Sequence, residues 1–156
     1  MTGQTAVVIG ASGGIGAAVA DALEADSRYD NVVRLSRTGN SPVAVDLTSE
    51  ASIEEAAKWL KAQDFSPSLV FVATGLLHGG EKGPEKSLRQ LDPDWLMENY
   101  QVNAIGPALV AKYFLPLMSR KEGGKFAALS ARVGSISDNR LGGWYGYRAS
   151  KAALNM

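Results

Sequence analysis

The feature that most constrains this chain is a glycine-rich turn between a short apolar run and a helix-like stretch. The run at residues 5–9 is compact and rich in β-branched side chains, which is typical of a buried parallel strand. Residues 15–25 place their apolar side chains on one helical face. Glycine tolerates positive φ and lets the backbone approach a ligand closely, so segment 10–16 predicts a tight strand-to-helix turn.

The same alternation of strand and helix continues along the chain. We expect strands at residues 5–9, 32–35, 43–45, 69–73 and 125–130. We expect helices at 15–25, from a cap at Thr48 or Ser49 to Leu60, at 94–118 with an interruption at Gly106-Pro107, and from near Trp144. Strands that alternate with helices form parallel sheets through right-handed crossovers. The sequence therefore predicts an α/β fold, a Rossmann-like doubly wound parallel sheet with strand order 3-2-1-4-5.

Composition excludes several classes of function. The 156 residues hold 16 basic and 16 acidic side chains, so no basic surface for nucleic acid is expected. The chain has no cysteine and its one histidine is His78, which argues against thiol catalysis, disulfides and a metal site. No apolar run reaches the ~18 residues that a membrane span needs, and no signal peptide precedes the first strand. We expect one cytoplasmic domain over residues 1–156 that binds neither nucleic acid nor membrane.

The glycine turn also predicts a ligand. Free N–H groups and the positive end of the helix dipole favour a pyrophosphate at a helix N-terminus. We expect the residues of this turn to hold the pyrophosphate of a dinucleotide, namely Gly10, Ser12, Gly14, Ile15 and Gly16. A glycine-rich loop without a ligand is the alternative, which the strand before it and the helix after it make weaker.

The end of the second predicted strand bears on which dinucleotide binds. A cofactor with a free ribose 2′-hydroxyl is usually met by an acidic residue, but this strand ends in Ser36 and Arg37. Arg37 can pair with a 2′-phosphate and Ser36 can donate to it, so NADP(H) is favoured over NAD(H). The alternative is that Arg37 is a solvated loop residue. Asp46 can accept from the adenine amino group, or it can cap the helix that follows.

Tyr147 and Lys151 are four residues apart and so share a face of the last predicted helix. A nearby ammonium group stabilises the phenolate and lowers the pKa of a tyrosine, which suits acid–base catalysis. Together with the glycine turn, Asp46-Leu47-Thr48 and Val102-Asn103-Ala104, this pair closely resembles the short-chain dehydrogenase/reductase family. The run at residues 142–156 is similar to the C-factor-type branch of that family.

The resemblance implies roles for individual residues. Tyr147 would protonate the carbonyl oxygen as hydride leaves the nicotinamide. Lys151 would lower the pKa of Tyr147 and hold the nicotinamide ribose. Asn103 would support a proton relay through water. The resemblance further implies cofactor contacts from Leu47, Thr74 and Gly75.

The serine that polarises the substrate carbonyl in the family is less plainly matched. The family's second serine after the fifth strand falls on Ala131 in this chain. Ser130 takes the role if the end of the strand is shifted by one residue, and Ser135 is a poorer candidate. Ser130 is therefore our candidate for this position.

The residues and the resemblance together predict an NADP(H)-dependent oxidoreductase that interconverts a small carbonyl compound and an alcohol. The alternative is a non-catalytic dinucleotide-binding protein of the same fold with a regulatory or scaffolding role. Members of the family continue through two more strands beyond the Tyr-Lys helix, so we expect the domain to be incomplete at its C-terminus. The resemblance also implies a homodimer or homotetramer for the complete protein.

Overall fold

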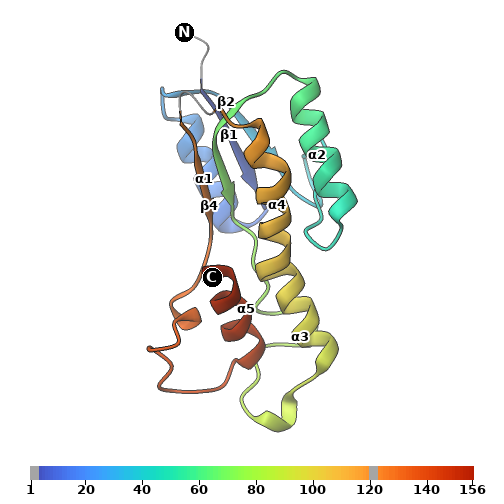
Figure 1. The fold of residues 1–156 in the computed structure, drawn as a ribbon, viewed down its shortest axis with the longest axis vertical. Coiled ribbons are helices and arrows are strands. Elements are labelled where there is room, and N and C mark those ends of the chain that lie inside the picture. Colours follow the sequence, from blue (N-terminus) through green and yellow to red (C-terminus); the bar gives the residue numbers. More distant parts are fainter. Residues whose placement is uncertain (1–3, 120–122) are drawn as a thin grey trace.

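The computed structural model describes residues 4–119 and 123–156, and the remaining six positions of the predicted domain lie outside the described residues. The strands are β1 (Gln4–Ile9), β2 (Tyr29–Leu35), β3 (Pro67–Val72) and β4 (Lys125–Ala128). The helices are α1 (Gly14–Glu24), α2 (Glu50–Ala62), α3 (Pro93–Tyr100), α4 (Gly106–Phe114) and α5 (Tyr145–Asn155). In Figure 1 the sheet lies in the upper part of the molecule, and α3 and α5 lie in the lower part.

The strands form one parallel sheet in the order β2-β1-β3-β4, which confirms the predicted doubly wound α/β architecture. The strand expected at 43–45 is wrong in detail, because it contributes only a single parallel bridge between Ser36 and Ala44. Pro42 precedes it and has no N–H to give to a sheet. The Ser41 hydroxyl also occupies local backbone groups, by accepting from Ser36 N and donating to Val43 O.

Alternate residues of the strands point to opposite faces of the sheet and build two apolar clusters. On one face, Ile9 and Val72 belong to the larger cluster, which α2 and α4 cover with side chains such as Phe114. On the other face, Val8 packs against α1 around Ala20. The helices therefore cover both faces of the sheet, and they leave the carboxyl ends of the strands at one edge for a site.

The expected interruption near Gly106-Pro107 takes the form of a π turn (Gln101–Ile105) that joins α3 to α4. The N–H of Gly106 donates to the carbonyl of Gln101, five residues back. A proline at position 107 has no N–H and crowds the carbonyl four residues before it, which is Asn103, so the wider turn accommodates the ring. Helical backbone continues through Tyr100 and Ile105, so α3 and α4 form one rod, seen in yellow and orange in Figure 1.

A substitution at Phe114 tests how much the larger apolar cluster contributes to the free energy of unfolding. Its side chain is fully buried, so Phe114→Ala should lower the free energy of unfolding by about 3–5 kcal/mol through lost contacts and a cavity. The matched control is the neighbouring Leu115→Ala, because Leu115 is 48% exposed and its loss should cost no more than about 0.5 kcal/mol. Urea denaturation of both variants measures the difference, and equal stabilities would contradict this account of the core.

Candidate functional site

The glycine turn folds as a close contact between the end of β1 and the start of α1. Gly10 has φ +87°, and its N–H donates to the Leu35 carbonyl at 2.8 Å. A Cβ at Gly16 would lie 2.2 Å from the carbonyl oxygen of Gly10, so only glycine lets the helix begin this close to the strand. In contrast, a Cβ at Gly14 would have no heavy atom within 4 Å, so the turn is open on that side.

The start of α1 offers unoccupied N–H groups. Its N-cap, Gly13, makes no side-chain capping bond, and the first turn contains no acidic residue. An uncapped helix N-terminus without a local negative charge is suited to an anion. Ile15, also predicted to contact the ligand here, is 61% exposed at this end of the helix.

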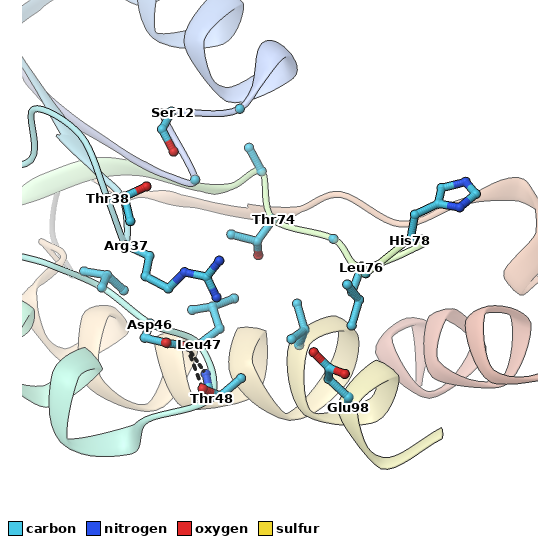
Figure 2. A pocket seen from close by; sticks show the side chains of 17 residues that line it. Ser12, Arg37, Thr38, Asp46, Leu47, Thr48, Thr74, Leu76, His78 and Glu98 are labelled. Atoms are coloured by element: carbon cyan, nitrogen blue, oxygen red, sulfur yellow. Dashed lines mark hydrogen bonds between the residues drawn. The ribbon is translucent and has the colours of Figure 1, made fainter. Parts of the chain in front are cut away.

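A cavity of about 450 Å³ adjoins the turn at the carboxyl edge of the sheet (Figure 2). Of the predicted ligand contacts, its walls contain Gly10, Ser12, Arg37, Asp46, Leu47, Thr74 and Gly75. The walls also contain residues that the sequence did not single out as cofactor contacts, namely Gly13, Thr38, Val45, Thr48, Ala73, Leu76, His78, Gly79, Glu98 and Val102. Several of these follow strand ends and could have been found from that rule. Glu98 and Val102 come from the long helical rod, and no local pattern marks them.

Arg37 and Asp46 lie on the same side of the cavity. Figure 2 shows the Arg37 side chain extending into it. Asp46 Oδ1 accepts from Thr48 N at 2.9 Å and from Thr48 Oγ1 at 2.7 Å. Burial raises the pKa of Asp46, but the Thr48 hydrogen bonds and the Arg37 charge outweigh it, so the pKa lies below its usual value. Asp46 is therefore an anion that orders the loop, whereas Ser49 caps α2.

Ser36 lies differently from the other predicted contacts. The residue is 5% exposed, and its hydroxyl donates to the Thr38 carbonyl within its own turn. It is absent from the residues that line the cavity. Ser36 therefore supports the loop that carries Arg37, and its predicted bond to a 2′-phosphate has no support in this geometry.

The segment after β3 connects the cavity to α5. Thr74 Oγ1 is buried and has no hydrogen-bond partner among the described residues, although Thr74 lines the cavity. A Cβ at Gly75 would lie 3.6 Å from Lys151 Nζ and 3.7 Å from Asn103 Oδ1. Gly75 thus lies in the cavity wall and directly against two of the predicted catalytic side chains.

The Asn103 side chain is fully buried and links three segments. Its Oδ1 accepts from Leu76 N at 2.7 Å, and its Nδ2 donates to Leu76 O at 2.9 Å and to Ser150 Oγ at 3.1 Å. Ser150 Oγ in turn donates to the Tyr147 carbonyl at 2.9 Å. Asn103 therefore holds the loop after β3 and the middle of α5 in a fixed relation to the π turn.

Tyr147 and Lys151 lie on one face of α5, as predicted. The Lys151 ammonium nitrogen is 5.8 Å from the centre of the Tyr147 ring and donates to the Leu129 carbonyl at 2.7 Å. Lys151 is 2% exposed, and burial lowers its pKa. Burial also raises the pKa of Tyr147. The direction for Tyr147 is opposite to the predicted one, because desolvation of the phenolate governs this arrangement.

Ser130 follows Leu129, whose carbonyl accepts from Lys151, but the Ser130 side chain has a different partner. Its hydroxyl donates to Asn155 Oδ1 at the end of α5. Asn155 is eight residues beyond Tyr147, which is about 12 Å along a helix axis. The predicted role of Ser130 thus has no support in this side-chain orientation. Ser135 instead lines a different pocket beside α5, together with Tyr145 and Arg148.

Two further properties of the described residues bear on function. Within 4–119 and 123–156, no group of three or more His, Asp or Glu side chains is placed to hold a metal ion. In the same part of the chain, no helix combines the length and the apolar character that crossing a membrane requires.

Comparison with known proteins gives a consistent result. The family model described as short chain dehydrogenase matches residues 4–156. A 1-hydroxy-2-glutathionyl-2-methyl-3-butene dehydrogenase from Rhodococcus sp. (strain AD45) is 32% identical over 162 residues, covering 98% of this chain and 67% of that protein. The C-signal protein of Myxococcus xanthus is 35% identical over 79 residues, covering 51% of this chain and 48% of that protein.

One solved structure is similar to the chain in both sequence and fold. It is a short-chain dehydrogenase/reductase from Burkholderia multivorans with bound NADP, with a TM-score of 0.83 and 27% identity. The match covers 97% of this chain and 69% of that one. The chain thus spans about two thirds of the length of the Rhodococcus relative and of this structure.

A substitution at Asn103 tests whether its side chain links the loop after β3 to α5. Asn103→Ala removes both bonds to Leu76 and the donor to Ser150, so the free energy of unfolding should fall by about 2–4 kcal/mol. Met97→Ala is the control on the same helical rod, because Met97 is 70% exposed and should cost no more than about 0.5 kcal/mol. Guanidinium denaturation measures both, and an Asn103→Ala protein as stable as Met97→Ala would contradict the linking role.

Proposed function

Because the chain belongs to the short-chain dehydrogenase family, we propose that it forms the cofactor-binding and catalytic part of an NADP(H)-dependent oxidoreductase that interconverts a carbonyl and an alcohol. The observation that carries the proposal is the position of Gly75. This residue lines the cavity beside the glycine turn and lies against Lys151 and Asn103. A dinucleotide that extends from the turn along this wall therefore ends beside the Tyr147–Lys151 face.

The residues present fit a dinucleotide. The uncapped N-terminus of α1 suits the pyrophosphate, and Gly10 and Gly16 let the chain turn tightly beneath it. The buried, unpartnered Thr74 Oγ1 is a polar group in the cavity wall that a ligand would satisfy. The bound nicotinamide would supply the hydride.

Arg37 supports NADP(H) over NAD(H). Its side chain extends into the cavity, and the described end of β2 presents no acid there to accept from a free ribose 2′-hydroxyl. A guanidinium forms charge-assisted, bidentate bonds with phosphate. The nearby Asp46 carboxylate is already engaged by Thr48, which leaves Arg37 as the charged group suited to a 2′-phosphate.

Tyr147 is proposed as the proton donor. Since burial raises its pKa, the phenol stays protonated through neutral pH and can give its proton to a carbonyl oxygen as hydride arrives. Reduction should then be lost as the pH rises through the pKa of Tyr147. Lys151, buried and anchored to the Leu129 carbonyl, is placed to hold the nicotinamide ribose. Asn103 positions both groups through Ser150.

A second candidate is a dinucleotide-binding protein without catalysis. It is favoured by Ala131 in the family's serine position and by the Ser130 hydroxyl, which is bound to Asn155. The two candidates differ in one measurement, because only the enzyme oxidises NADPH with a ketone or quinone. Tight NADPH binding without turnover over such a panel favours the second candidate.

The Tyr147→Phe variant tests the proton donor. Loss of the hydroxyl should lower kcat for ketone reduction by about 10²- to 10⁴-fold, because a positioned general acid contributes that much. The rise in melting temperature on adding NADPH should remain, since the phenol is not needed for binding. Tyr145→Phe, two residues away and off this face, is the control and should keep its activity. Unchanged kcat in Tyr147→Phe would refute the assignment.

The Arg37→Ala variant tests the cofactor preference. Removing a charge-assisted contact with a 2′-phosphate should weaken NADPH binding by about 10- to 100-fold. NADH binding should stay within about twofold of the original protein, because NADH has no 2′-phosphate to lose. Arg28→Ala is the matched control, since Arg28 pairs with Asp26 away from the cavity. Isothermal titration calorimetry measures the affinity of each protein for both nucleotides. If the original protein binds NADH more tightly than NADPH, the proposed preference for NADP(H) is wrong.

A further inference from the structure

The N-terminus of α5 lacks a cap of its own. Its N-cap residue, Trp144, has left-handed backbone with φ +54°, makes no side-chain capping bond, and is followed by a first turn without an acidic residue. The first N–H groups of a helix need acceptors from elsewhere when they are buried. Here the acceptor comes from a distant loop.

That loop supplies Glu85. Its carbonyl oxygen accepts from Trp144 N at 2.6 Å, and its Oε2 accepts from Gly146 N at 3.2 Å. Gly146 is the second residue of α5, the position whose N–H an N-cap side chain ordinarily satisfies. Glu85 is 2% exposed, so its carboxylate is enclosed at the helix end. The residue therefore caps α5 from 61 positions upstream.

The chain around α5 is shaped to receive this carboxylate. Gly142 and Gly143 have φ +63° and +66°, so the two residues before Trp144 have left-handed backbone conformations, which glycine adopts without strain. A Cβ at Gly143 would lie 3.1 Å from the Glu85 carbonyl oxygen, and one at Gly146 would lie 3.0 Å from Glu85 Oε1. Larger residues at these two glycines would push the Glu85 loop away from the helix.

A buried carboxylate is a costly way to fill this space. Glu85 Oε1 is buried and has no hydrogen-bond partner among the described residues. Removing a charge from water without full compensation lowers stability, and an apolar side chain of similar shape would avoid that cost. A negative charge at a helix N-terminus instead interacts favourably with the helix dipole and forms a charge-assisted bond to the N–H. A buried carboxylate at this point is therefore better explained by a role in positioning the start of α5 than by a gain in folding stability.

We propose that Glu85 is a positioning residue, whose buried carboxylate fixes the start of α5 and thereby the register of Tyr147 and Lys151. Tyr147 follows the capped Gly146 directly. One turn later, Asn103 holds Ser150, so α5 is fixed at two points, its N-terminus and its middle. The catalytic consequence rests on the proposed function, whereas the capping itself does not.

Amide hydrogen exchange of the purified protein tests the capping without any assay of activity. In Glu85→Ala, exchange in residues 144–148 should be about tenfold faster or more, as expected when a cap is lost and the helix end opens. Glu85→Gln keeps an acceptor but no charge, so exchange should rise only about threefold. Asp92→Ala is the matched control, because Asp92 caps α3 by accepting from Trp95 N. It should speed exchange at the start of α3 and leave 144–148 unchanged.

Two exchange results would overturn the proposal. The first is that the amide exchange rates of residues 144–148 in both Glu85→Ala and Glu85→Gln stay within about twofold of those in the original protein. The other is equal acceleration there by Asp92→Ala, which would indicate general loosening. Should Glu85→Ala fail to fold, the Glu85→Gln protein alone still decides, because its expected increase is confined to the same residues.

Turnover with NADPH and a ketone tests the catalytic consequence. Glu85→Ala should lower kcat about tenfold, with the KM for NADPH within about twofold, because Glu85 is not among the residues that line the cofactor cavity. Glu85→Gln should restore most of kcat. Unchanged kcat in Glu85→Ala despite faster exchange would overturn the catalytic consequence alone. If the original protein shows no turnover with any substrate, the proposed function fails while the exchange result still decides the capping.

Discussion

The side-chain amide of Asn103 is the contact on which the arrangement of the site depends. It satisfies both backbone groups of Leu76 and donates to Ser150, so one buried side chain joins the segment after β3 to α5. An amide is suited to this because it donates and accepts at once. A carboxylate, a hydroxyl or an apolar group of the same size would leave at least one of the Leu76 groups without its partner. Asn103 thus joins the wall of the cavity beside the glycine turn to the helix that carries Tyr147 and Lys151.

The backbone that presents Asn103 is itself unusual, and the same turn shapes the cavity. The π turn adds one residue to the helical repeat between α3 and α4, which rotates the side chains before it relative to those after it. Gly106 ends the turn, and a Cβ there would lie 2.7 Å from the Leu47 Cβ. Leu47 lines the cavity, as does Val102 within the turn. Pro107 thus favours a turn that places Asn103 and part of the cavity wall together.

The features that could be predicted from the sequence are those that depend on near neighbours. The glycine turn and the shared helix face of Tyr147 and Lys151 follow from spacing within one or two turns of chain, and the structure has both. The catalytic role of the pair stays a prediction. The apolar pattern at 43–45 predicts a full strand, but the segment forms a single bridge, because Pro42 before it has no N–H to donate to the sheet. The bonding of Ser130 and the capping by Glu85 escaped prediction because their partners, Asn155 and Gly146, are brought near only by the fold.

Unsatisfied polar atoms gather at one end of the molecule. Among the described residues, the buried side-chain atoms without a hydrogen-bond partner are Thr74 Oγ1, Glu85 Oε1 and Arg148 Nε. All three belong to the cavity wall, to α5 or to the loop that caps it, and none belongs to the two apolar clusters of the sheet. Each such atom lowers stability. The apolar clusters of the sheet hold none of these atoms, so the burial of their side chains offsets the cost of the unpartnered groups at the other end of the molecule.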